Sequence, residues 1–177
     1  SLKSNKEMEP IYGHRPGHLF RGKKGDGLEG GHRVPLIVSW PGQFQPGTSN
    51  EVICQTDFFA TFAEILGTKL PADAGEDSIS FLSVLKGKDL KQPVRESIIH
   101  YSSYGSFAIR EGRWKLILPP EIGNSEEFGA SARGQLYDLK ADIGESRNLW
   151  EQQPSRVDRL RKLLEKYRAQ NSSRNDT

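Results

Sequence analysis

The stretch Phe20–Gly42, FRGKKGDGLEGGHRVPLIVSWPG, decides how the rest of the chain is interpreted. It opens with a basic, glycine-rich loop over residues 20–27 and continues through Glu29–Arg33 into an apolar run. Because glycine accepts positive φ angles and leaves room beside the backbone, such a loop can lie close to a ligand. The neighbouring arginine and lysine side chains supply positive charge. The pattern is therefore typical of a site that holds an oxyanion.

The apolar run Val34–Trp40 predicts a buried strand of a mostly parallel sheet. Its residues are β-branched or large and apolar, and Pro41-Gly42 closes it. Pro35 has no N–H donor, so it fits only among the first residues of a strand. A strand at this place puts the preceding basic loop at a strand end, where open α/β sheets bind their ligands.

Two helices are predicted between this run and residue 90. Residues Thr56–Leu66 carry apolar side chains at steps of three and four, with Thr56 or Asp57 as the N-cap and Gly67 as the end. We expect the aromatic side chains of this helix to pack in the core. Residues Ile79–Leu85 predict a short amphipathic turn or helix that ends at Gly87.

From Pro93 onward the sequence predicts an antiparallel sheet followed by a helix. Glu111-Gly112 has the length and composition of a two-residue hairpin turn. Helix Pro154–Gln170 begins with proline in its first turn and carries one apolar stripe, which we expect to cover one face of the sheet. The four predicted strands are Ser97–Ser102, Ser106–Arg110, Trp114–Leu118 and Gln135–Leu139.

Several motifs of this chain, taken in order, resemble the type I sulfatases. Besides the opening stretch they are Gln55–Thr61 (QTDFFAT), Phe107–Arg110 (FAIR), Trp114–Leu116 (WKL) and Gln135–Leu139 (QLYDL). The resemblance covers nearly the whole chain but only the C-terminal part of such an enzyme.

The resemblance implies an α/β fold class, as the C-terminal part of an alkaline-phosphatase-like fold. A core strand and helix would be followed by a small four-stranded antiparallel sheet packed by the C-terminal helix. Residues 1–92 would then end the catalytic α/β domain, residues 93–170 would form the sheet-and-helix subdomain, and residues 171–177 would be a disordered tail.

The resemblance also implies that Lys24 is the catalytic lysine that contacts the sulfate. In the family this lysine belongs to an Arg-Gly-x-Lys pattern, and counting from Arg21 places it at Lys24. Lysine suits the role because it is a compact permanent cation with three donors. An exposed loop lysine is the alternative interpretation.

Four further residues are candidates for contact with the substrate, namely His14, His18, Arg21 and His32. For the first two histidines the alternative is a solvated position in a loop. For His32 a packed position that supports the loop is the first interpretation. We also expect Glu29 and Arg33 to form an ion pair around this loop.

Calcium and a formylglycine nucleophile are implied by the resemblance, with their residues expected outside this chain. The Asp-Asn pair that ligates calcium in the family is not found upstream of the lysine loop. The lone cysteine, Cys54, lies in Ile-Cys-Gln-Thr-Asp, which does not match the family's nucleophile pattern, so we interpret it as a small buried hydrophobe. The four histidines have no cysteine-paired zinc spacing, and no metal ligand is predicted in this chain.

The predicted function is therefore hydrolysis of an aryl or carbohydrate sulfate monoester by a parent sulfatase, with this chain inactive alone. Two alternatives stay open. One is a phosphodiester or phosphonate hydrolase of the same superfamily, and the other is a non-catalytic domain that binds sulfated glycans.

Charge and hydropathy exclude other classes. With 25 Lys and Arg residues against 23 Asp and Glu residues, the net charge of +2 does not indicate a nucleic-acid or membrane-surface partner. Asp158 and Glu165 interrupt the basic residues of the C-terminal helix, which predicts a solvated face. No segment approaches the roughly 18 apolar residues of a membrane span.

The first ten residues have no signal-peptide core, and the first residue is Ser1 rather than methionine. We therefore interpret the chain as truncated or processed. A periplasmic or secreted location is implied by the family resemblance alone.

Overall fold

The computed structural model describes residues 11–15, 17–120 and 133–174, which divide into two compact units. Unit 1 contains Ser1–Val34 and Ile99–Leu160, and unit 2 contains Pro35–Ile98 and Arg161–Thr177. No helix in the described part of the chain is long and apolar enough to cross a membrane. The domain limits expected from the sequence stay a prediction.

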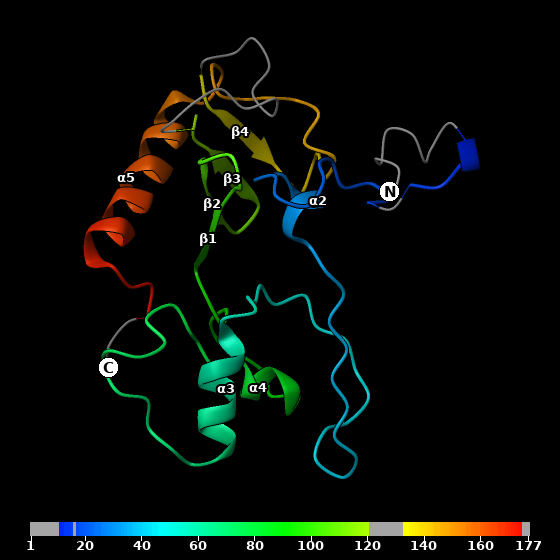
Figure 1. Ribbon diagram of the computed structural model, residues 1–177, viewed down its shortest axis with the longest axis vertical. Helices are drawn as coiled ribbons and strands as arrows, with labels where there is room; N and C mark the ends of the chain where they lie inside the picture. The colour runs from blue at the N-terminus through cyan, green and yellow to red at the C-terminus, as the bar shows by residue number, and fades with distance from the viewer. Residues whose placement is uncertain (1–10, 16, 121–132, 175–177) are drawn as a thin grey trace. The chain divides into compact units, whose positions relative to one another are not determined.

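Four strands form one sheet in the order β1-β2-β3-β4 (Figure 1). The pairs β2–β3 and β3–β4 are antiparallel, and Ile117 of β3 lies opposite both Ala108 of β2 and Gln135 of β4. This arrangement confirms the predicted four-stranded sheet. The strands are β1 (Ser97–Tyr101), β2 (Phe107–Glu111), β3 (Trp114–Ile117) and β4 (Gln135–Asp138).

The predicted hairpin turn was wrong by one residue. Glu111 pairs with Trp114, so the two turn residues are Gly112 and Arg113. Gly112 has φ of +55°, which a turn matched to strand twist requires and which glycine accepts without a steric cost. The Arg113 side chain is then free to pair with Asp138 of β4.

One face of this sheet packs on the end of the basic loop. Leu28 forms a buried cluster with Ala108, Ile117, Tyr137 and Leu139. Each of these side chains is at most 5% exposed to solvent. The loop that carries the candidate lysine is therefore anchored in the hydrophobic core of unit 1.

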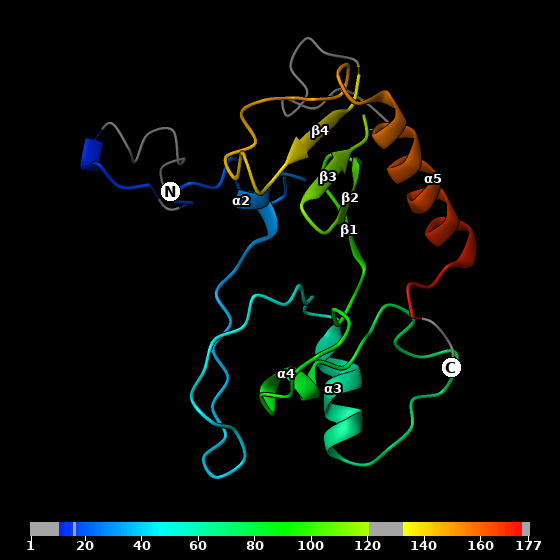
Figure 2. The same cartoon turned by 180° about the vertical axis from the view of Figure 1, so that it is seen from behind.

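Helix α5 (Pro154–Gln170) has the predicted bounds, and its first turns lie beside the sheet in both views (Figures 1 and 2). The Arg156 guanidinium lies 4.0 Å from the ring centroid of Trp114, and Arg159 pairs with Glu111. Long side chains thus cover the hairpin β2–β3. The buried apolar stripe of the helix contains Val157, Leu160 and Leu164.

Unit 2 contains the two predicted helices, α3 (Asp57–Ile65) and α4 (Leu82–Leu85). Gly67 and Gly87 follow them with φ of +66° and +63°, as expected for glycines that end helices. The rings of Phe58 and Phe81 meet edge to face. The prediction that the aromatic side chains of α3 all pack in a core was wrong for Phe59 and Phe62, which are 52% and 56% exposed.

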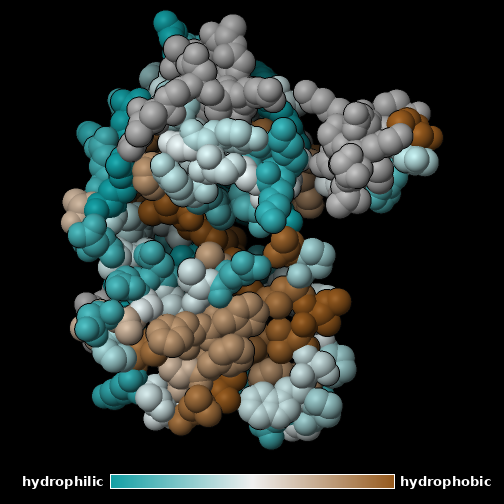
Figure 3. All heavy atoms as spheres, in the orientation of Figure 1, coloured by the Kyte–Doolittle hydropathy of each residue, from teal (hydrophilic) through white to brown (hydrophobic). Residues whose placement is uncertain are grey.

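The predicted buried strand Val34–Trp40 was also wrong. These residues form no strand, and Ile37 is 92% exposed. A strand needs a neighbour that pairs with its backbone, and none of the described residues forms a ladder with this segment. In Figure 3 hydrophobic side chains cover a broad area over the part of the molecule that holds α3 and α4. The exposed residues of unit 2 include Leu36, Ile37, Val38, Trp40, Phe59, Phe62 and Leu66.

Two expectations from the sequence, a buried Cys54 and a disordered tail over residues 171–177, differ from the structure. Cys54 is part-buried rather than fully buried. Arg174, predicted in the disordered tail, donates to the carbonyl oxygens of Ala74 at 2.8 Å and Pro71 at 3.0 Å. Residues 175–177 of that tail lie outside the described residues.

Asp57 is the polar centre of unit 2. Its buried carboxylate accepts hydrogen bonds from the backbone N–H groups of Cys54 at 2.7 Å and Ile79 at 2.9 Å. The guanidinium of Arg95, itself 4% exposed, forms an ion pair with the same carboxylate. Neither Thr56 nor Asp57 caps α3 through its side chain. The Asp57 carboxylate is bound instead to Cys54, Ile79 and Arg95.

We expect Asp57→Asn to lower the free energy of unfolding of unit 2 by about 3–5 kcal/mol, because it leaves the buried Arg95 cation unpaired. Urea denaturation followed by circular dichroism measures this loss. Asp89→Asn, which neutralises an exposed carboxylate, is the matched control and should stay within about 0.5 kcal/mol of the wild type. Equal stability of the two variants would contradict the assignment.

Candidate functional site

The lysine loop, residues 21–28, is closed by hydrogen bonds. The N–H of Gly30, in the helix that directly follows, donates to the Arg21 carbonyl oxygen at 2.7 Å and so draws the end of the loop to its start. Between them, the Asp26 carboxylate accepts from Lys23 N–H at 2.8 Å, and Asp26 N–H donates to the Lys23 carbonyl oxygen at 3.0 Å. Lys24 therefore lies on a tight turn inside a closed loop.

Helix α2 (Glu29–His32) follows directly and packs on the loop backbone. A Cβ atom at Gly31 would lie 2.2 Å from the Asp26 carbonyl oxygen, and one at Gly30 would lie 2.6 Å from the Arg21 carbonyl oxygen. Only glycine leaves room for this approach. The Gly30-Gly31 pair thus sets the distance between the helix and the loop.

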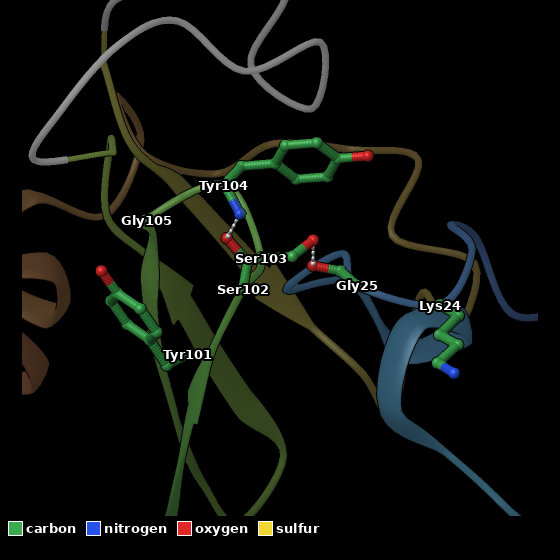
Figure 4. Close-up of a pocket in the computed structure, with 7 residues that line it drawn as sticks. All are labelled: Lys24, Gly25, Tyr101, Ser102, Ser103, Tyr104 and Gly105. Carbon is green, nitrogen blue, oxygen red and sulfur yellow. Dashed lines mark hydrogen bonds between the residues drawn. The ribbon is translucent and has the colours of Figure 1, made fainter.

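The turn between β1 and β2 holds the other side of the lysine loop. Ser103 donates to the Gly25 carbonyl oxygen through its N–H at 2.8 Å and its hydroxyl at 3.1 Å (Figure 4). These contacts form one edge of an open pocket of about 750 Å³. The pocket is lined by Lys24, Gly25, Tyr101, Ser102, Ser103, Tyr104 and Gly105.

Lys24 lines this pocket with an exposed side chain. Figure 4 shows the side chain extending away from Ser103 and Tyr104. Its ammonium group therefore points away from the other side chains that line the pocket. Lys24 is therefore one of the residues that line the pocket, and its role in sulfate binding stays a prediction.

Arg21 reaches from the start of the loop to β4 and the turn beyond it. Its Nη1 donates to the Glu145 carbonyl oxygen at 2.7 Å and to the Tyr137 hydroxyl at 3.3 Å. The Tyr137 hydroxyl in turn donates to Gln135 at 2.7 Å. These contacts support the loop, and a contact between Arg21 and substrate stays a prediction.

His14 and His18 are exposed, and His18 has φ of +51°. Its N–H donates to the Arg15 carbonyl oxygen at 2.9 Å, which closes a local turn. No hydrogen bond described in this structure joins either ring to the lysine loop. Contact of these two histidines with substrate stays a prediction.

A buried charge cluster lies under the loop. The fully buried Nζ of Lys115 is 2.9 Å from Glu29 Oε1 and 2.9 Å from Glu145 Oε1. Arg33 and Arg110 each lie 3.5 Å from Glu29 Oε2. The expected pairing of Glu29 with Arg33 is confirmed, but the sequence analysis did not identify Lys115 or Glu145. The available signal was a lysine inside an apolar strand, which is seldom buried without a partner.

The two histidines beside this cluster are neutral at pH 7. Burial, together with the nearby Lys115 cation, lowers the pKa of His32 to about 3. Burial likewise lowers the pKa of His100 to about 3, aided by His32 and Lys115. The two rings stack with centroids 3.7 Å apart, and His32 Nε2 lies 3.0 Å from Lys115 Nζ. This geometry favours the packed, supporting role for His32.

Glu145 has the opposite kind of shift. Burial raises the pKa of its carboxyl group, while the Lys115 cation and the Glu29 N–H favour the ionised form. The carboxylate therefore depends on these two partners to remain charged inside the protein.

We expect His100→Phe to reduce the loss of stability in acid. Because the folded pKa of His100 is about 3, below its ordinary 6.5, the unfolded chain binds the proton more readily between these values. The stabilisation is complete above pH 6.5 and is lost as pH falls toward 3, by up to about 1.4 kcal/mol per pH unit. Phenylalanine keeps the ring stack and removes this titration.

Urea denaturation at several pH values between 4 and 6 measures the slope of the unfolding free energy. His14→Phe is the control at an exposed histidine and should keep the wild-type slope. Titration of Glu145 is common to all three proteins and cancels in the comparison. Identical slopes for wild type and His100→Phe would show that the buried pair does not resist protonation.

The comparisons with known proteins match this chain to sulfatases. A family model described as N-sulphoglucosamine sulphohydrolase, C-terminal, matches residues 27–171. The N-acetylgalactosamine-6-O-sulfatase of Bacteroides thetaiotaomicron is 38% identical over 163 residues, which are 89% of this chain and 32% of that protein. An arylsulfatase of Hemicentrotus pulcherrimus is 36% identical over 117 residues, covering 66% of this chain and 21% of the relative.

A solved structure described in connection with the metabolism of multiple glycosaminoglycans by Bacteroides thetaiotaomicron superposes with a TM-score of 0.82 at 37% identity. The match covers 93% of this chain and 35% of that chain. The complex of Ps i-CgsB with k-i-k-neocarrahexaose has a TM-score of 0.59 at 20% identity, over 84% of this chain and 31% of that chain, and shows the fold alone.

This chain thus spans about a third of the length of the first relatives it matches. The fold predicted from the motifs is confirmed by these neighbours. With a family model that matches most of its length and relatives above 30% identity, the chain belongs to the sulfatase family, within its C-terminal domain, and has the fold of the C-terminal part of an alkaline-phosphatase-like enzyme.

Proposed function

We propose that this chain is the C-terminal part of an enzyme that hydrolyses sulfate monoesters, and that Lys24 binds the sulfate. The observation that carries the proposal is the position of Lys24 on a closed loop at the rim of an open pocket. A lysine ammonium can bind a tetrahedral oxyanion as a point charge. Charge placed where oxygen charge develops in the transition state is a large source of catalysis.

The other pocket residues are suited to the group that carries the sulfate. Tyr104 is 38% exposed and Tyr101 is 62% exposed, so both rings offer an apolar surface with a polar tip. The relative at 38% identity is named for an N-acetylgalactosamine-6-O-sulfate substrate. We therefore favour a carbohydrate sulfate over an aryl sulfate as the substrate class.

The nucleophile and the metal are proposed to belong to the remainder of the enzyme. The described residues contain no group of three or more His, Cys, Asp or Glu side chains that fits a metal ion. The backbone N–H of Cys54 donates to the Asp57 carboxylate, a contact that belongs to the core of unit 2. These residues do not fit Ca²⁺ or formylglycine, so no step is assigned to either group in this chain.

The exposed apolar surface of unit 2 supports the same proposal. An apolar pocket of about 260 Å³ lies between residues 38–44 and the helices α3 and α4, and the exposed Val38 and Trp40 line it. The exposed Leu36 and Ile37 come directly before these residues. Contiguous apolar surface of this kind marks an interface. We propose that it packs against the remaining α/β domain of a sulfatase, since the first relatives are about three times as long.

The isolated chain is expected to show no turnover of 4-nitrophenyl sulfate, because it contributes a sulfate-binding cation without a nucleophile. An absorbance assay of purified residues 1–177 at high concentration measures this. Release of the phenol above the buffer rate, sensitive to Lys24→Ala, would overturn the proposal that the chemistry needs the remainder of the enzyme.

In the enzyme that joins this chain to a sulfatase catalytic domain, we expect Lys24→Ala to lower kcat about 10²–10³-fold, as loss of one oxyanion-binding group does. Steady-state kinetics on a sulfated N-acetylgalactosamine and on an aryl sulfate measure the effect and compare the two substrate classes. Lys23→Ala, one position earlier on the exposed turn, is the matched control. Equal activity of the two variants would exclude the role of Lys24 and would favour a non-catalytic, glycan-binding domain.

A further inference from the structure

Both ends of the lysine loop are held by one residue, Glu145. At the start of the loop, Arg21 Nη1 donates to the Glu145 carbonyl oxygen at 2.7 Å. At its end, Glu29 N–H donates to Glu145 Oε2 at 2.7 Å. Lys24 lies between these two attachments. A shift of Glu145 would therefore move both ends of the turn that presents the lysine.

Glu145 has an unusual backbone conformation for its residue type. Its φ is +51°, and its side chain is fully buried. A non-glycine residue in the left-handed region is strained and persists only where its surroundings impose that conformation. Here the turn is closed by Glu145 N–H, which donates to the Asp142 carbonyl oxygen at 3.2 Å. The Asp142 carboxylate also accepts from Arg147 N–H at 2.7 Å.

Lys115 connects Glu145 to the sheet. It belongs to β3, which is hydrogen-bonded to a strand on each side, so its backbone is well fixed. Its ammonium lies 2.9 Å from the Glu145 carboxylate and 2.9 Å from the carboxylate of Glu29, the residue that directly follows the lysine loop. Two buried carboxylates so close together would repel each other without this cation. Lys115 therefore fixes their spacing relative to the strand.

We propose that Glu145 and Lys115 are positioning residues that set the place of the Lys24 ammonium. The inference rests on the proposed role of Lys24. Neither residue lines the pocket, and both are fully buried, so they act through the loop rather than on substrate. A displacement of about 1 Å in a catalytic group can reduce the rate about 10²-fold.

The test uses the enzyme that joins this chain to a sulfatase catalytic domain, with a sulfated N-acetylgalactosamine as the probe. We expect Glu145→Ala to lower kcat about 10–100-fold with little change in KM, because the lost interaction matters in the transition state. Glu145→Gln keeps an oxygen that accepts from Glu29 N–H. It should recover most of this loss, even though the charge opposite Lys115 is gone.

A double-mutant cycle with Lys24→Ala separates positioning from a general structural effect. If Glu145 acts through Lys24, Glu145→Ala should lower kcat in the wild-type background and have no further effect on kcat in the Lys24→Ala background. Its effect on the unfolding temperature should be the same in both. Lys140→Ala, at an exposed residue that follows β4, is the control and should leave kcat unchanged.

The outcomes are distinct. An unchanged kcat in Glu145→Ala, with Lys24→Ala impaired, would overturn the inference and leave the proposed function standing. Equal losses in both backgrounds would also overturn it, because they would show an effect independent of Lys24. An unimpaired Lys24→Ala enzyme would overturn the proposed function itself. If Glu145→Ala does not fold, the same cycle with Lys115→Arg, which keeps the buried positive charge but alters its geometry, gives the decision.

Discussion

Unit 1 depends on a buried charge cluster, in which the Lys115 ammonium pairs with the carboxylates of both Glu29 and Glu145. All three side chains are fully buried, so each charge has lost its hydration and must be offset by its partners. The three residues come from a central strand, the end of the lysine loop and the turn beyond β4. The attraction of the Lys115 ammonium for both carboxylates therefore joins these three segments.

Close backbone packing gives this arrangement its precision. Gly31 lets α2 lie against the lysine loop, and Gly25 lets the β1–β2 turn lie against it from the other side, where a Cβ atom would come within 2.4 Å of the Ser103 hydroxyl oxygen. Leu28 anchors the loop end in the core. The side chain of Lys24 is exposed, yet the backbone beneath it is held on every side. This combination is expected of a binding group carried on a rigid support.

Unit 2 follows a different physical logic. Its polar centre, the ion pair of Asp57 with Arg95, is buried, whereas much of its apolar surface is open to solvent. Apolar side chains on both sides of an extended segment are seldom stable in water unless something covers them. The length of the first sulfatase relatives, about three times that of this chain, supplies a reason for such a surface. Under the proposed function, this uncovered face packs against the remainder of the enzyme.

The sequence by itself determined the elements whose signals are local. The period of Pro154–Gln170 and the strand-like composition of the four β segments were sufficient, and the ordered motifs were sufficient to assign the family. Only the tertiary structure decided that Val34–Trp40 is an exposed segment, because an apolar run indicates burial without naming its neighbour. It also revealed the pairing of Lys115 with Glu145, 30 positions apart. Such contacts depend on which strand and turn meet in space, and no local pattern records that meeting.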